Sequence, residues 1–317
     1  MQSATGKPFL TIGTRGSPLA LVQAKDVRKR LAEIHHVPQS EISIAIISTI
    51  GDRSQPANQP MSQVGTSGLF TKEIEDQLLA GTIDVGVHSS KDMASILPKG
   101  LVMPVFLPRE DVRDAFVSLK YNSLDDLPEG ATLGTSSLRR RAQIGRIRPD
   151  IKCIEFRGNV GTRLQKLENE IADATLLASA GLIRTGQADK ITAFLDPQTF
   201  PPAPAQGAIG IEFRDSDKRV AELVSPLNDP ETYRAIVAER AFLREMDGSC
   251  RTPIAALSTR KGDDLTLFGQ VLSLDGSEVF EDQITGPADD GALFGPELAR
   301  RLLEAAGPEF IENLKAL

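Results

Sequence analysis

The chain has 317 residues, a formal net charge of -7, 40% hydrophobic residues and 25% charged residues. This length exceeds what one hydrophobic core usually holds, so we expect two or three domains of ordinary globular composition. The acidic balance argues against general nucleic-acid binding. No apolar run is long enough to span a bilayer, which argues against a membrane protein.

The N-terminus and the cysteine content indicate where the chain resides. Residues 1–10 lack a basic start followed by an apolar core, so we expect no signal peptide. Two cysteines, Cys153 and Cys250, are too few for a disulfide framework, which fits a cytoplasmic, reducing location. They and the three histidines show no metal-ligand spacing, so we expect no metal site.

The first half of the chain reads as alternating strands and helices. Residues 9–14 form a predicted buried strand, and Ser17 followed by Pro18 is a strong helix start, because serine caps and proline fits the first helical position. The pattern then predicts a strand at 42–48, a loop at 51–68, a helix at 69–80 and a strand at 84–88. This last strand ends in Ser89-Ser90-Lys91-Asp92.

The same order occurs a second time. A strand at 131–135 precedes a helix that begins at Ser136 or Ser137. A strand at 151–156, a helix at 160–171 and a strand at 174–178 complete the repeat. Such β-α-β units form parallel sheets that bind ligands at the carboxyl ends of the strands, so we predict two α/β lobes that face a cleft.

The rest of the sequence predicts two connections between the lobes and a third domain. Residues 104–113 and 200–207 are the expected crossings between lobes, and 209–213 adds a strand to the first lobe. We then expect a helix at 231–246, a hairpin at 265–274 and 279–284 with Asp275-Gly276 in its turn, and a helix at 296–306. The predicted domains are 1–107 with 208–225 (first lobe), 108–207 (second lobe) and 226–317 (a small α+β domain).

Arginines concentrate between residues 134 and 163 of this acidic chain. They are Arg139, Arg140, Arg141, Arg146, Arg148, Arg157 and Arg163. They follow two predicted strand ends, where a helix N-terminus also offers free N–H donors. Guanidinium groups bind carboxylates or phosphates at two points, so we predict an anion site, with both ligand classes open. The alternative is a solvated helix face.

Two other positions are candidates for chemistry. Asp92, beside Lys91, is either an exposed ion pair or a carboxylate that stays ionised in the cleft and stabilises a developing cation or moves a proton. Cys250, in a polar loop beside Arg251, is either a small buried hydrophobe or a reactive thiolate. Cys153, inside a predicted strand, and His88, without a second ligand nearby, are expected to be structural.

These segments together resemble the porphobilinogen deaminase family. The matching segments include IGTRGSPLALVQA, GLFTKEIEDQLLAGTIDVGVHSSKDM, LGTSSLRRRAQI, FRGNVGTRL, PAPAQGAIGIEFR and ERAFLREMDGSCRTPIA, in order and over nearly the whole chain. The resemblance implies two lobes like type II periplasmic binding proteins, with a central cleft, plus a small C-terminal α+β domain. It implies a monomeric transferase that joins four porphobilinogens into 1-hydroxymethylbilane and releases ammonia, in tetrapyrrole biosynthesis.

The resemblance also assigns residues. It implies a dipyrromethane cofactor attached through a thioether to Cys250, and Asp92 as the catalytic residue. It implies no metal, and neither a nucleic-acid nor a membrane partner. The residues implied to bind cofactor and substrate are Arg15, Ser17, Ser89, Lys91, Thr135, Ser137, Arg139, Arg140, Arg157, Arg163, Arg184 and Gln206.

One departure and two alternatives remain. The family's loop sequence G-K-G-L-F has Ser67 in place of its lysine here, so a charged contact from this loop is lost unless Lys72 supplies it. A two-lobed binding protein or regulator would share the repeat and the anion site, but it would not need a reactive cysteine. A nucleic-acid binder could use the arginines, but aromatic content of 5% offers little stacking surface.

Overall fold

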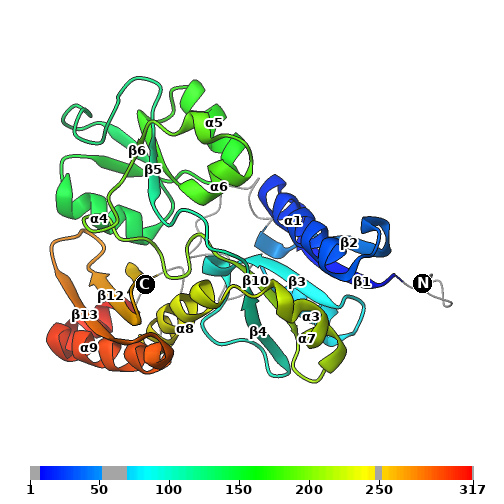
Figure 1. Ribbon diagram of the computed structural model, residues 1–317. Helices are drawn as coiled ribbons and strands as arrows, with labels where there is room; N and C mark the ends of the chain where they lie inside the picture. Colours follow the sequence, from blue (N-terminus) through cyan, green and yellow to red (C-terminus); the bar gives the residue numbers. More distant parts are fainter. Residues whose placement is uncertain (1–7, 52–69, 247–251, 316–317) are drawn as a thin grey trace. The chain divides into compact units, whose positions relative to one another are not determined.

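The computed structural model describes residues 8–51, 70–246 and 252–315. These residues form two compact units, drawn in Figure 1. The first unit extends to Arg109 and also contains Ala208–Tyr233, whereas the second contains Glu110–Gly207 and the residues from Arg234 onward. Cys250 and Ser67 lie outside the described residues, and so does most of the loop predicted at 51–68.

The first unit is built on a five-stranded sheet in the order β2-β1-β3-β10-β4. Its strands are β1 (Leu10–Arg15), β2 (Ile42–Ile47), β3 (Val85–Ser89), β4 (Leu101–Phe106) and β10 (Ile209–Arg214). The first three are parallel, and β10 runs antiparallel to both β3 and β4. The predicted return strand is therefore confirmed, and it enters the sheet in the direction opposite to the three parallel strands.

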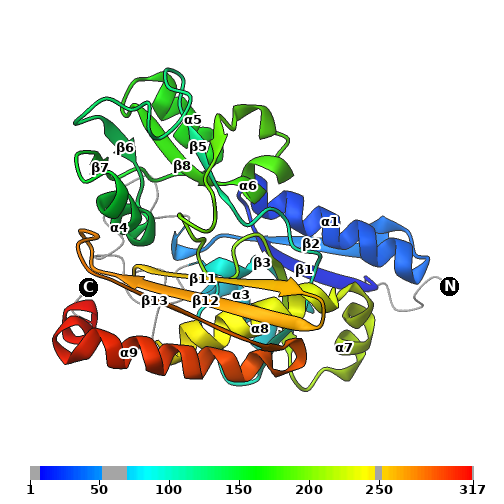
Figure 2. The ribbon, with the colours of Figure 1, turned by 60° about the vertical axis from the view of Figure 1, so that its left-hand side comes forward.

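The helices of the first unit can be compared with those that the sequence predicts. Helix α1 (Pro18–His35) begins at the predicted cap, where Ser17 Oγ accepts a hydrogen bond from the Ala20 amide at 3.3 Å. Ala24, Val27 and Leu31 on its apolar face are fully buried in the core beside β1, and Figure 2 shows the helix lying along β1 and β2. Helix α3 (Lys72–Leu79) is shorter than the predicted 69–80, and α7 (Lys218–Val224) was not predicted.

The second unit contains a sheet of the same pattern, in the order β7-β6-β8-β5-β9. Its strands are β5 (Asp114–Val117), β6 (Thr132–Gly134), β7 (Lys152–Ile154), β8 (Ala174–Ala178) and β9 (Ala193–Phe194), and its helices are α4 (Leu138–Ile147), α5 (Val160–Glu168) and α6 (Ser179–Arg184). Again three strands are parallel and the fourth, β5, is antiparallel. Two like α/β sheets confirm the predicted class.

The C-terminal part of the second unit is a three-stranded antiparallel sheet with helices. It comprises α8 (Pro230–Glu245), which starts in the first unit, β11 (Ile254–Lys261), β12 (Asp264–Leu272), β13 (Val279–Pro287) and α9 (Gly291–Lys315). The predicted hairpin is β12–β13, and α9 lies along this sheet in Figure 2. Helix α9 is longer than predicted and is interrupted at Gly307. Among the described helices, none combines the length and apolar character required to cross a membrane.

Helix α4 packs closely on the turn of this hairpin. A Cβ atom at Gly145 would collide with the carbonyl oxygen of Asp275, and one at Gly276 would collide with the carbonyl oxygen of Ala142. Gly276 also has a φ of +76°, which favours glycine. The two glycines thus allow α4 and the β12–β13 turn to meet backbone to backbone.

We predict that Gly145→Ala lowers the free energy of unfolding by about 1–3 kcal/mol, because the new methyl group displaces the turn backbone. Gly161→Ala is the matched control, since it is also helical and its Cβ would have its nearest neighbour at 3.5 Å. Urea unfolding followed by circular dichroism measures both. Equal stability of the two variants would contradict the close packing.

Candidate active site

In the first unit, the carboxyl ends of β1 and β3 enclose a small cavity. Because these parallel strands are neighbours, the residues that follow them meet at one sheet edge. A cavity of about 60 Å³ opens there, lined by Arg15, Ser17, Leu19, Ala20, Phe70, Thr71, Val87, His88, Ser89 and Asp92. Four residues predicted for the site, Arg15, Ser17, Ser89 and Asp92, therefore line one cavity.

Hydrogen bonds and packing fix most of this cavity and leave Asp92 exposed. Gln23 Nε2 donates to Ser89 Oγ at 2.9 Å, so α1 holds the end of β3. The Arg15 guanidinium lies over the Phe70 ring, 4.1 Å from its centroid. Asp92 ends the 3-10 turn η3 (Ser90–Asp92), and among the described residues its carboxylate has no hydrogen bond or ion pair. This carboxylate is available to a ligand.

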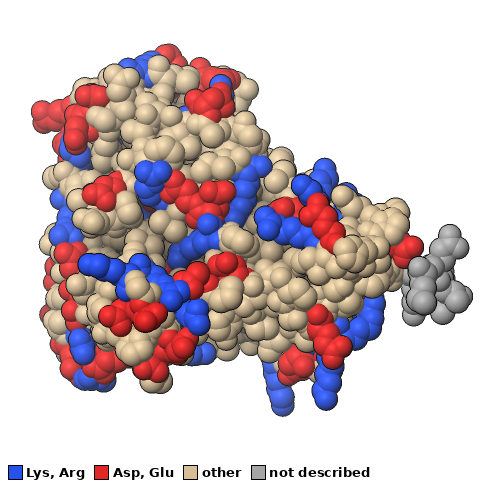
Figure 3. Space-filling model, in the orientation of Figure 1, with Lys and Arg blue, Asp and Glu red and all other residues tan. Residues whose placement is uncertain are grey.

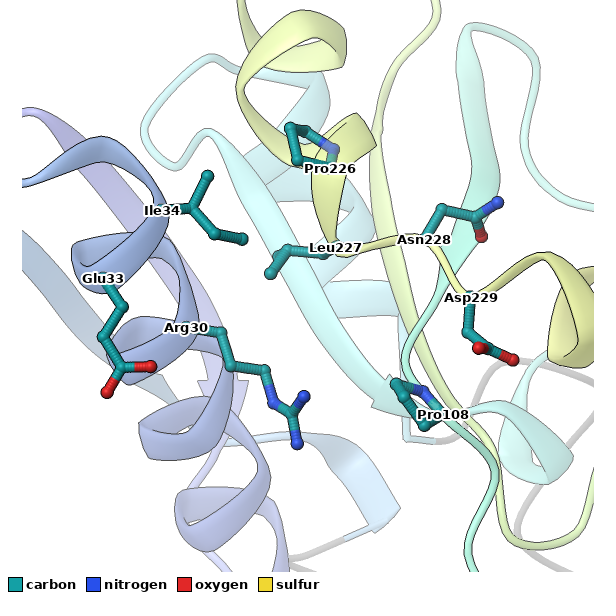
Figure 4. A pocket seen from close by; sticks show the side chains of 8 residues that line it. All are labelled: Arg30, Glu33, Ile34, Pro108, Pro226, Leu227, Asn228 and Asp229. Carbon is teal, nitrogen blue, oxygen red and sulfur yellow. The ribbon is translucent and has the colours of Figure 1, made fainter.

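A larger cavity lies elsewhere in the first unit and contains none of the predicted residues. It measures about 340 Å³ and is lined by Arg30, Glu33, Ile34, Pro108, Pro226, Leu227, Asn228 and Asp229, shown in Figure 4. Asn228 Oδ1 accepts a hydrogen bond from the Phe106 amide, and Asp229 Oδ1 accepts one from the Thr232 amide. These polar groups secure β4 and the start of α8, which is a structural use.

In the second unit, Asp114 gathers three of the predicted binding residues. Arg139 Nη2 donates to Asp114 Oδ2 at 2.8 Å, and Arg140 Nη2 donates to Asp114 Oδ1 at 2.7 Å. Gln206 Nε2 donates to the same Oδ1 at 2.9 Å. Ser137, whose Oγ accepts from the Arg140 amide, caps α4 and positions both arginines on its first turn.

The charges of this cluster do not cancel. Arg139 and Arg140 are 4% and 5% exposed, and Asp114 is fully buried. Burial alone would raise the pKa of Asp114, but the two guanidinium groups outweigh it and hold that pKa well below its usual range. Two cations then share one anion. Among the described residues the buried Nε atoms of both arginines lack an acceptor, so the cluster keeps one excess positive charge and unused hydrogen-bond donors.

This burial excludes a solvated helix face for Arg139 and Arg140. Figure 3 shows lysine and arginine side chains interspersed with aspartate and glutamate on the visible face. The two buried arginines contribute little to that surface charge. The cluster is therefore an internal feature of the second unit.

The other predicted residues of the second unit lie in its turns. Thr135 Oγ1 accepts a hydrogen bond from the Ser137 amide at 3.2 Å. Arg163 Nε donates to the Gly158 carbonyl at 3.0 Å, and Arg184 Nη2 donates to the Gly207 carbonyl at 2.7 Å. Arg157 is 5% exposed, and its carbonyl accepts from a lysine of α5. The guanidinium groups of Arg163 and Arg184 are thus held in part by backbone oxygens.

Several contacts escaped the sequence analysis. The sequence offers one indication of Asp114, because it is a charged residue at the start of an otherwise apolar strand. No neighbouring residue in the sequence indicates its partners. Gln143 accepts from Arg139 Nη1 at 2.8 Å and donates to Gln270 of β12 at 3.1 Å, so the three-stranded sheet reaches the arginine pair.

Cys153 is partly buried in β7, where burial raises the pKa of its thiol, as expected for a structural cysteine. No metal-ligand cluster occurs among the residues described.

We predict that Asp114→Asn lowers the free energy of unfolding by about 3–5 kcal/mol at pH 7, because it leaves two buried guanidinium groups without an anion. The folded-state pKa of Asp114 is depressed, so its stabilising contribution is present above about pH 4 and is lost as the pH falls further. The difference between wild type and variant should therefore shrink on acidification, as urea unfolding at pH 7, 5 and 3.5 would measure. Asp189→Asn, at an exposed pair with Lys190, is the control and should cost less than about 1 kcal/mol. A variant as stable as wild type at pH 7 would contradict the account.

Comparison with known proteins identifies the family. Residues 10–222 match the model of the porphobilinogen deaminase, dipyromethane cofactor binding domain, and residues 233–304 match that of the porphobilinogen deaminase C-terminal domain. The chain is 50% identical over 303 residues to a porphobilinogen deaminase of Paracoccus denitrificans, covering 96% of each chain. It is 52% identical over 311 residues to that of Nitrobacter winogradskyi, covering 98% of each.

Solved structures of binding proteins are similar at low identity. The methionine-binding protein MetQ has a TM-score of 0.44 at 12% identity and covers 71% of this chain and 91% of its own. A putative methionine-binding lipoprotein from Bacillus subtilis has a TM-score of 0.42 at 13% identity and covers 70% of this chain and 91% of its own. The family matches and the two relatives, which span nearly the full length, place this chain in the porphobilinogen deaminase family.

Proposed function

We propose that this chain is a transferase that joins porphobilinogen units into 1-hydroxymethylbilane and releases ammonia, in tetrapyrrole biosynthesis. The observation that carries the proposal is identity of 50% and 52% to two porphobilinogen deaminases over 96% and 98% of the chain. A binding protein or a nucleic-acid binder would share the lobes or the arginines, but neither would share this identity over the whole length.

The many cations match the chemistry of this substrate. Each porphobilinogen carries an acetate and a propionate, so a growing chain accumulates carboxylates and needs several fixed cations. Arg139 and Arg140 fit this need, because their cluster has one excess positive charge and two N–H groups without an acceptor among the described residues. The further proposed binding residues are Arg15, Ser17, Ser89, Lys91, Thr135, Ser137, Arg157, Arg163, Arg184 and Gln206.

The same donors fit the family's cofactor, dipyrromethane, which consists of two substrate units and carries their carboxylates. Cys250 would hold it through a thioether, and Arg139 and Arg140 would bind its carboxylates. When bound, dipyrromethane supplies the pyrrole carbon to which the first substrate is joined.

Lys72, the substitute considered for the missing loop lysine, pairs with Asp76 at 3.2 Å on an exposed helix face.

Asp92 is the proposed catalytic residue. Loss of ammonia leaves an electron-poor methylene pyrrole, whose positive charge an adjacent carboxylate stabilises. The carboxylate of Asp92 is exposed at its cavity and is not consumed by a hydrogen bond or ion pair among the described residues. It can therefore bind pyrrole N–H groups and stabilise the cation without first breaking an internal contact.

The proposed organisation has three domains and a single chain. The first lobe comprises 1–107 and 208–225, the second 108–207, and the C-terminal domain 226–317. Support comes from the three separate sheets, each with its own buried cluster. We further propose a cytoplasmic monomer whose ligand is a small molecule rather than a nucleic acid or a membrane.

We predict that Asp92→Asn keeps the fold but lowers kcat at least about 100-fold, because the amide cannot stabilise the developing cation. Ammonia release from porphobilinogen and the melting temperature measure the two properties. Asp26→Asn, at a surface pair with Arg30, is the matched control and should retain activity. Near-normal turnover by Asp92→Asn would remove this residue from the mechanism.

We predict that the purified chain has an intact mass above that of its sequence by a two-pyrrole adduct, and that Cys250→Ala lacks this adduct. Cys153→Ala is the control and should retain the adduct, since its partly buried side chain packs against the core. Mass spectrometry of the three proteins decides the attachment site. An adduct that persists in Cys250→Ala would place the cofactor on another residue.

A further inference from the structure

His88, which lines the Asp92 cavity, is grouped with two other buried ionisable side chains. His88 on β3 is 5% exposed, Glu212 on β10 is fully buried, and Glu75 on α3 is 7% exposed. From the sequence we expected a structural role for His88 and none in particular for either glutamate. Buried charges are costly unless they are paired, so their grouping calls for a physical reason.

Strand register brings His88 and Glu212 together. In the antiparallel pair of β3 and β10, His88 lies opposite Gly210, and Glu212 lies opposite Gly86. The two long side chains are therefore diagonal neighbours on one face, and the positions across from them carry no side chain. A Cβ atom at Gly86 would lie 2.6 Å from His88 Nε2, so glycine is what leaves room for the imidazole.

The hydrogen bond between them orients the imidazole. His88 Nε2 and Glu212 Oε2 are 3.1 Å apart. With Glu212 as a carboxylate, Nε2 is the donor, and Nδ1 then carries the lone pair. Among the described residues Nδ1 has no hydrogen-bond partner, and His88 lines the same cavity as Asp92. A carboxylate behind an imidazole that borders a reaction cavity is the arrangement of a general base.

Charged side chains face His88 from several elements of the first unit. It faces Glu212 from β10, Glu75 from α3, Asp92 after β3, and Arg15 from the end of β1. Burial raises the pKa of Glu75, and the nearby Glu212 raises it further. Glu212 Oε1 has no hydrogen-bond partner among the described residues. An imidazolium at His88 would therefore be compensated by an adjacent buried carboxylate.

We propose that His88, oriented by Glu212, is a second proton-transfer group of the Asp92 cavity. This inference rests on the proposed function. In that reaction, the C–N bond of a protonated aminomethyl group breaks and its electron pair leaves with ammonia. The freed carbon bonds to a ring carbon of a second pyrrole, which must then lose its proton. His88 Nδ1 accepts this proton and passes it to ammonia, giving ammonium and restoring the neutral imidazole.

The first test is His88→Gln, whose amide can still donate to Glu212 but is not a base. We expect kcat to fall about 100-fold, with KM, melting temperature and the mass of the attached adduct unchanged. His35→Gln is the matched control, because His35 lies at the end of α1 and contacts the Leu223 carbonyl; it should keep wild-type kcat. A His88→Gln variant within about threefold of wild-type kcat would overturn the proposal.

The second test does not depend on His88→Gln folding correctly. Glu212→Gln removes the anion that faces His88 Nε2, so an imidazolium formed there during turnover loses its counter-charge. The pH at which kcat/KM falls on the acidic side of its pH profile should be lower by about one pH unit in this variant. An unshifted profile would overturn the proposal, since loss of a merely structural contact would lower activity without shifting the profile.

A third readout is independent of activity. Nitrogen-15 NMR of the histidine rings should show an Nε2–H tautomer that is absent from His88→Gln and retained in His35→Gln. An Nδ1–H tautomer at His88 would overturn the proposal, because the lone pair would then face Glu212. Wild-type protein that releases no ammonia from porphobilinogen would instead refute the proposed function, and the NMR result would remain interpretable.

Discussion

One buried carboxylate organises the cationic part of this molecule. Asp114 binds the guanidinium groups of Arg139 and Arg140 and the amide of Gln206, and all four side chains are buried. Without that anion, two positive charges at the start of α4 would face each other away from water at a cost of several kcal/mol. With it, the cluster keeps one excess positive charge. The stability of the second unit and the proposed anion binding thus depend on the same contact.

In the first unit, the order and direction of the strands determine which side chains meet at the Asp92 cavity. The parallel pairing of β1 and β3 brings Arg15 and Asp92 to one cavity, and the antiparallel insertion of β10 places Glu212 behind it. The proposed reaction passes through a cationic pyrrole. It therefore requires an anion that stabilises the positive charge and a base that accepts the ring proton. In the proposed mechanism Asp92 supplies the first and His88 the second.

The predictions that succeeded rest on local sequence. Ser17 and Ser137 cap helices because each cap bonds an amide three residues ahead, so a short window contains the whole signal. The β12–β13 turn followed for the same reason from Asp275-Gly276. The predicted end of the last helix at 306 matches the break at Gly307, whereas its start at Gly291 was missed, because the segment before 296 is held by the packing of Phe294 in the core.

The contacts that were missed join distant parts of the chain. Asp114 and Arg139 are 25 residues apart, and His88 and Glu212 are 124 apart. No residue pattern indicates such pairs, because they arise from β5 and β10 entering their sheets antiparallel. The partner of His88 could not be predicted from the sequence for this reason, since it is supplied by a strand that returns after the whole second lobe.

The most direct test is to incubate the purified chain with porphobilinogen and to follow ammonia and pyrrole products together. The account predicts one ammonia per porphobilinogen consumed and release of a linear four-ring product. Folded protein that carries its two-pyrrole adduct yet releases no ammonia would contradict it.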